Sequence, residues 1–86
     1  MSELCRFGAV SIYMYQNDHG PVHFHVRYQG RQVSVELATL QITQGDLPAP
    51  IRRQVLRWAR HRESELERAW QQVSAYERPD TIAPLD

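Results

Sequence analysis

The sequence predicts an α+β fold: a three- to four-stranded antiparallel meander with one long C-terminal helix packed on one face. Between residues 7 and 44, apolar and polar residues alternate with the period of a β-strand, and turn-forming residues interrupt the alternation. From residue 51 onward, the apolar residues recur with the spacing of an amphipathic helix. We therefore expect a single domain over residues 1–86, with the meander at 7–44, the helix at 48–76 and an extended tail at 77–86.

The meander is predicted from three strongly alternating segments and one weaker one. The first strand is expected over residues 7–15, the second over 23–28 and the third over 32–37. A tight hairpin turn joins the second strand to the third, because Gly30 adopts positive φ without steric cost. A short fourth strand is expected around residues 40–42, where the turn signal is weak.

The helix is expected to begin at Pro48 or Pro50, since proline is tolerated in a first helical turn, and to end before Pro79. Its apolar stripe would cover one face of the sheet and leave the other face open. That open face combines aromatic, basic and polar side chains: Ser11, Tyr13, Tyr15, His23, His25, Arg27, Ser34 and Glu36. Such a face is suited to binding a ligand or another chain.

Composition excludes several classes of protein. Ten acidic and ten basic residues give a net charge of +0, which argues against binding nucleic acid through bulk charge. Cys5 is the only cysteine, so no disulfide forms within the chain. The first residues lack the pattern of a signal peptide, and no apolar run reaches the roughly 18 residues of a membrane span. We expect a cytoplasmic protein with no membrane partner.

The main candidate site lies between residues 18 and 25. His23 and His25 are two apart on a predicted strand, so both imidazoles project to the same side. With Asp18 and His19 on the preceding turn, they would form a site for zinc or a similar divalent metal ion. Acid–base catalysis without metal is a second interpretation, with His19, His23, His25 and Arg27 as catalytic residues. A third is that the histidines stack on tyrosines in a homodimer interface without any chemistry.

A second candidate site lies on the predicted helix. Arg53, Arg57 and Arg60 cluster on the side away from the apolar stripe and could bind the phosphates of an RNA. The alternative is a solvated helix face, balanced by the glutamates at 63, 65 and 67.

Two groups of residues resemble a known family. The first is the string Asn17-Asp18-His19-x-Pro21-x-His23-Phe24-His25-Val26, followed by Gly30; the second comprises Leu56, Trp58, Ala59, His61, Glu65, Leu66 and Trp70. Both resemble the small bacterial proteins grouped as the domain-of-unknown-function family numbered 4160, whose members are uncharacterised. The resemblance implies an arrangement of the toxin–antitoxin type, with a partner protein and an RNA-directed role.

Two functions follow as expectations. The first is an interaction module of a two-protein regulatory pair, which uses the open sheet face to bind a small protein partner or a second copy of itself. The alternative is an RNA-directed or metal-assisted hydrolase, in which His19, His23 and His25 act as acid–base groups or metal ligands.

Overall fold

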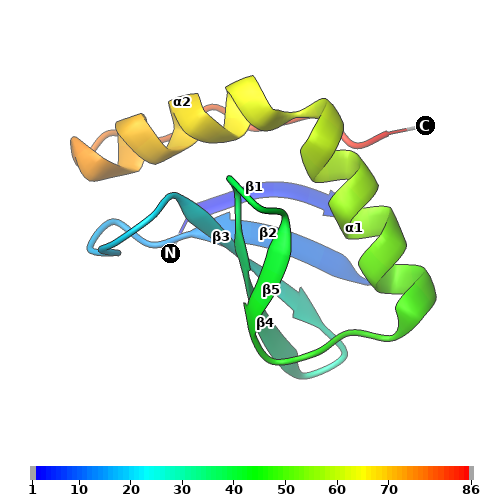
Figure 1. Cartoon of the computed structure of the whole chain (residues 1–86). Coiled ribbons are helices and arrows are strands. Elements are labelled where there is room, and N and C mark those ends of the chain that lie inside the picture. Colours follow the sequence, from blue (N-terminus) through cyan, green and yellow to red (C-terminus); the bar gives the residue numbers. More distant parts are fainter. Residues whose placement is uncertain (1, 86) are drawn as a thin grey trace.

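A computed structural model describes residues 2–85 and has an α+β architecture in which a five-stranded antiparallel sheet carries two helices on one face (Figure 1). The strands follow the chain in the order β1-β2-β3-β4-β5. Their bounds are Ser2–Phe7 for β1, Val10–Met14 for β2, His23–Tyr28 for β3, Arg31–Glu36 for β4 and Gln41–Gln44 for β5. The helices are α1, Ala49–His61, and α2, Glu63–Ser74. The predicted α+β class and antiparallel meander are therefore confirmed, while the numbers of strands and helices are corrected below.

The sheet has five strands instead of three or four because the residues before Phe7 form a strand of their own. Gly8, with φ of +56°, makes the turn that separates β1 from β2. The register shifts between Glu3 and Cys5, and this bulge leaves both Leu4 and Cys5 buried. Two consecutive buried residues hide the alternation by which the other strands were predicted.

The predicted single helix is broken into α1 and α2 at Arg62, whose φ of −125° and ψ of 21° are not helical. The Arg62 side chain reaches the C-terminal tail, where Nε donates to the Ala83 carbonyl at 3.1 Å and an Nη donates to the Pro84 carbonyl at 3.3 Å. The Trp58 indole donates to the same Ala83 carbonyl at 3.0 Å. The chain thus changes direction between α1 and α2 at Arg62, the residue whose side chain hydrogen-bonds to the C-terminal tail (Figure 1).

The core lies between the sheet and the helices. Alternate residues of β2, β3 and β4 face the helices, which contribute Val55, Trp58, Ala59, Leu66, Ala69 and Val73. The tail also takes part, since Ile82 is buried and its amide donates to the Leu4 carbonyl at 2.7 Å. The tail therefore caps the outer edge of β1. Within residues 2–85, none of the helices combines the length and apolar character that a bilayer span demands.

Candidate metal centre

The open face of the sheet is organised around one row of side chains across three strands. Tyr13 of β2 pairs with His25 of β3, and His25 pairs with Ser34 of β4. The turn between β3 and β4 sets this register, because Gln29 and Gly30 both have positive φ, +47° and +76°. A two-residue turn of this kind matches the twist of the strands that it joins. The turn thus places His25 beside Ser34.

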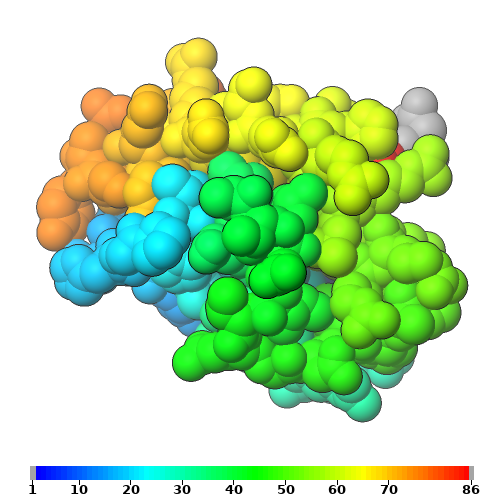
Figure 2. Space-filling model, viewed as in Figure 1, coloured from blue at the N-terminus to red at the C-terminus, as the bar shows by residue number. Residues whose placement is uncertain are grey.

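The loop between β2 and β3 folds back over the start of β3 and carries Asp18 to the histidines. The loop is held at both ends: the Val22 carbonyl accepts the Leu37 amide at 3.0 Å, and Asn17 Oδ1 accepts the Tyr76 hydroxyl at 3.0 Å. Figure 2 shows this loop, in cyan, on the surface beside the C-terminal end of α2, in orange. The position of Asp18 therefore depends on the end of α2, far along the chain.

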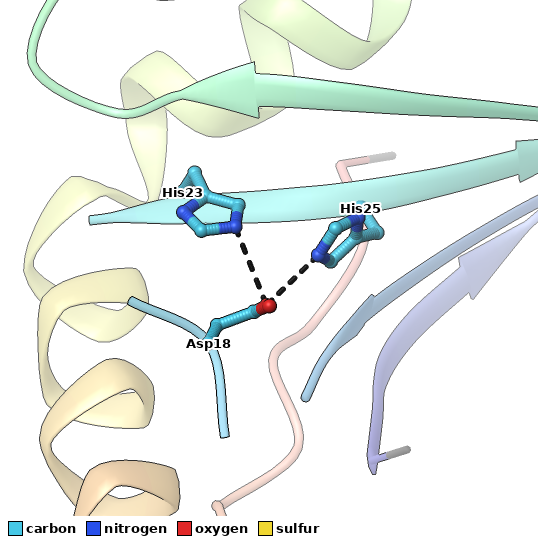
Figure 3. Close-up of side chains that lie close together, drawn as sticks. All are labelled: Asp18, His23 and His25. Carbon is cyan, nitrogen blue, oxygen red and sulfur yellow. Dashed lines mark hydrogen bonds and ion pairs between the residues drawn. The ribbon is translucent and has the colours of Figure 1, made fainter. Parts of the chain in front are cut away.

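Asp18, His23 and His25 meet at a single point. The Asp18 Oδ2 atom lies 2.9 Å from His25 Nε2 and 3.3 Å from His23 Nε2. Figure 3 shows both imidazole rings aimed at this one carboxylate oxygen. The His25 side chain is 9% exposed, and those of His23 and Asp18 are 19% and 21% exposed. The cluster is partly shielded from water, with one side open.

The other ring nitrogen of each histidine already has a partner. His23 Nδ1 lies 2.8 Å from the Pro21 carbonyl oxygen, which can only accept, so this nitrogen carries a hydrogen. His25 Nδ1 lies 3.2 Å from Ser34 Oγ, a hydroxyl that can donate or accept. Both Nε2 atoms are therefore directed to Asp18 by contacts on the opposite side of their rings.

Aromatic side chains fix the orientation of both imidazoles. Tyr13 stacks on His25 with centroids 5.4 Å apart and planes 20° apart, and Tyr15 meets the same ring edge-on at 4.7 Å. His23 packs against Trp70 of α2, with centroids 5.1 Å apart. Burial raises the pKa of the Tyr13 hydroxyl above its ordinary value of 10.0, so Tyr13 is a neutral neighbour at physiological pH.

Three potential ligand atoms lie close enough together to hold one metal ion. One carboxylate oxygen and two imidazole nitrogens lie within 4.8 Å of one another. A tetrahedral zinc ion with bonds of about 2.0–2.2 Å needs its ligands about 3.4 Å apart. The separation of 3.3 Å between Asp18 Oδ2 and His23 Nε2 is close to this value, and that of 2.9 Å between Asp18 Oδ2 and His25 Nε2 is shorter. Two nitrogens and one oxygen suit zinc or iron(II), and three protein ligands leave at least one position open.

The remaining predicted site residues lie apart from this cluster. His19 lines the same pocket but is not among the three residues that could share an ion. Arg27 lies two residues further along β3, with its guanidinium 5.4 Å from the centre of the Tyr13 ring. Arg53, Arg57 and Arg60 are exposed on α1, on the other side of the sheet. The structure thus brings together three of the four predicted metal ligands.

Sequence reasoning missed the groups that support the cluster. Ser34 was assigned to the open face but not to the site, although the turn at Gln29 and Gly30 would have indicated its place beside His25. Trp70 lies on α2, and its contact with His23 has no signal in the sequence. Glu36 also lines the pocket of about 480 Å³ into which the cluster opens.

A comparison with protein families shows to which family the chain belongs. The model of the family described as "Domain of unknown function (DUF4160)" matches residues 10–71. The chain belongs to the DUF4160 family. The matched region runs from β2 into α2 and includes Asp18, His23, His25 and Ser34, whereas β1 and the tail lie outside it. No curated protein and no solved structure matches the chain.

Proposed function

We propose that this DUF4160 domain binds one divalent transition-metal ion through Asp18, His23 and His25 and uses it in a hydrolytic reaction. The observation that carries the proposal is the convergence of two imidazole Nε2 atoms on one carboxylate oxygen. The Nδ1 atoms are held by Pro21 and Ser34, as is usual for the second ring nitrogen of metal-binding histidines.

The hydrogen on His23 Nδ1 also supports a cation at this site. Because His23 Nδ1 donates to the Pro21 carbonyl, the Nε2 of a neutral ring presents a lone pair to the Asp18 carboxylate at 3.3 Å. Two acceptors then face each other, and a cation between them relieves the repulsion. The competing explanation is a second proton on His23, which would make a simple ion pair with Asp18. Metal binding separates the two explanations.

The open side of the cluster supports the reaction class. The pocket of about 480 Å³ is lined by the three ligands together with Glu36, Thr43 and Gln44. An ion with an open position acts as a Lewis acid in hydrolysis. Glu36 pairs with His23 across β3 and β4 and is the carboxylate that would take a proton from an attacking water. The sequence-derived alternative of a metal-assisted hydrolase is thus retained, with Glu36 added.

The first experiment measures metal binding directly. Untagged protein, freed of metal with a chelator, would be titrated with Zn²⁺ by calorimetry and with Co²⁺ by visible absorption. We expect one ion per chain and the intense cobalt bands of a tetrahedral site. Because each variant removes a ligand, His25→Ala and Asp18→Asn should each weaken binding by about 100-fold or more, at or above the range for supporting residues. Absence of binding in the unaltered protein would refute the proposal.

Two other histidines serve as controls for this experiment. His61 lies on α1, outside the cluster, with Nδ1 donating to the Arg57 carbonyl at 2.9 Å. His61→Ala should leave metal affinity unchanged, which separates specific binding from general binding by histidine. His19→Ala should change it by less than about tenfold, since His19 is not among the clustered ligands.

The hydrolysis itself is tested with model esters. The zinc-loaded protein would be assayed with bis(4-nitrophenyl) phosphate and 4-nitrophenyl acetate. We expect turnover that disappears with His25→Ala and falls by about 100-fold or more with Glu36→Gln, the range for a general base. Metal binding without turnover of either ester would restrict the proposal to a binding role.

The interaction-module function expected from the sequence stays a prediction, together with its protein partner, homodimer and RNA roles. The exposed Arg27 and half-buried Tyr15 on the open face are the residues that would contact a second chain. Sedimentation of the purified protein over a range of concentrations tests self-association.

A further inference from the structure

A second hollow lies on the other side of the molecule, where α1 meets the sheet. Its walls come from four separate segments: the turn between β1 and β2, the end of β3, the exposed side of α1 and the C-terminal tail. It has a volume of about 500 Å³, which lies within the range of small-molecule sites in proteins. The hollow shares no lining residue with the pocket beside Asp18.

Most of the residues that line this hollow are apolar or aromatic. Trp58 is buried and packs against Phe7, with ring centroids 6.0 Å apart. Tyr28, Ile51 and Leu85 are only half buried, although they pack against the core. Partly exposed large apolar side chains gathered around one hollow are characteristic of a binding site. They suit a flat apolar body of one or two rings.

One charge accompanies this apolar surface. Among the lining residues that the structure describes, Arg57 alone is charged, and it is exposed. Among residues 2–85, no carboxylate forms an ion pair with Arg57. A guanidinium at the rim of an apolar pocket is placed to bind a carboxylate or sulfonate with two hydrogen bonds.

We propose that this hollow binds a small organic anion, with its ring system against Trp58, Phe7 and Ile51 and its acidic group on Arg57. Charge complementarity selects an anion, since none of the described residues that line the hollow is acidic. Because this surface is concave, it fits a small molecule better than the flat surface of another protein. The proposal is independent of the metal centre and of the hydrolytic reaction.

The experiment uses two probes that differ in one charged group. The anion 8-anilinonaphthalene-1-sulfonate has an apolar ring system and a sulfonate, and N-phenyl-1-naphthylamine has the same ring system without it. Protein labelled with 5-fluorotryptophan gives two ¹⁹F resonances, one from Trp58 and one from Trp70. Since Trp58 lines the hollow and Trp70 packs on His23, the resonance that moves identifies the occupied site.

We expect the anionic probe to bind once per chain and to shift the Trp58 resonance only. Arg57→Gln should weaken its binding by about tenfold or more, the value of a charge-assisted hydrogen bond, and should leave binding of the neutral probe unchanged. Arg53→Gln is the matched control, because Arg53 is exposed on the same helix but does not line the hollow. Both substitutions are on the surface, so the fold is retained.

Several results would overturn the proposal. They are no binding of the anionic probe, a shift at Trp70 instead of Trp58, or an equal loss of affinity in Arg57→Gln and Arg53→Gln. A dimer in which Tyr28 and Ile51 are covered by a second copy would also overturn it, and sedimentation with and without the probe detects such a dimer.

Discussion

On the face of the sheet that the helices cover, the central side chains of β2, β3 and β4 are apolar and at most 1% exposed: Val10, Ile12, Met14, Phe24, Val26, Val33 and Val35. On the opposite face, one row across the same strands is also buried: as whole residues, Tyr13 is 1% exposed, and His25 and Ser34 are each 7% exposed. No helix covers that row. Tyr15, Arg27 and the loop that carries Asp18 enclose it instead.

The difference between the two faces lies in what each contact requires. Apolar burial on the covered face is non-directional and sums over many atoms. The row on the open face depends on single atoms, such as Ser34 Oγ and Asp18 Oδ2, placed within hydrogen-bonding distance of His25. The Tyr13 hydroxyl is also buried on this face, where the Tyr13 ring lies beside Tyr15 and the Arg27 guanidinium. The covered face therefore supports the fold, and the open face carries the candidate site.

The largest expected effect tests the covered face. Phe24→Ala removes a fully buried ring that packs against Trp58 and should lower the free energy of unfolding by about 3–5 kcal/mol. Urea unfolding followed by circular dichroism measures the change. Should the variant be too unstable to purify, Phe24→Leu gives a smaller loss of the same sign. A loss below about 1 kcal/mol for Phe24→Ala would contradict the assignment of this face as the core.

A smaller effect tests the open face through an atom that is not among the three candidate metal ligands. Ser34→Ala removes the hydroxyl that orients His25 Nδ1 and should weaken zinc binding by about 10–100-fold, the usual loss for such a partner. Calorimetric titration with Zn²⁺ measures it. Ser11→Ala is the matched control, since Ser11 lies on the same face but pairs with Arg27 instead of His25. Equal losses in the two variants would mean that Ser34 has no special role.

The local parts of this organisation could be predicted from sequence. The alternation in β3 placed His23 and His25 on the face opposite Phe24 and Val26, because side chains in a strand alternate with a period of two. The turn at Gly30 likewise predicted the pairing of β3 with β4. These features depend only on neighbouring residues.

The parts that failed depend on contacts between distant residues. Asp18 and His19 are adjacent in the sequence and are both predicted as metal ligands, and the loop brings only Asp18 into the cluster with His23 and His25. That loop is held by a hydrogen bond from Tyr76 to Asn17, 59 residues away. Similarly, the break at Arg62 coincides with its hydrogen bond to Ala83, 21 residues later. Neither contact leaves a periodic signal in the sequence.

The smallest expected effect is a change in pH-dependent stability at Cys5, which is buried on the covered face. Burial raises the pKa of the Cys5 thiol above its ordinary value of 9.0. Cys5 therefore stays protonated to a higher pH in the folded protein than in the unfolded chain. The resulting stability is fully present below pH 9.0 and is lost as the pH rises through the folded-state pKa. Unfolding in urea between pH 8 and 10.5 should therefore show a smaller decline for Cys5→Ala than for the unaltered protein.

Thiol reactivity provides the independent measurement for Cys5. The thiolate is the reactive form, and Cys5 is 6% exposed, so a disulfide reagent should modify the folded protein far more slowly than the urea-unfolded chain at the same pH. Equal rates in the two states would mean that the β1 edge opens freely. In that case the contact between the Ile82 amide and the Leu4 carbonyl, next to Cys5, does not hold that edge closed.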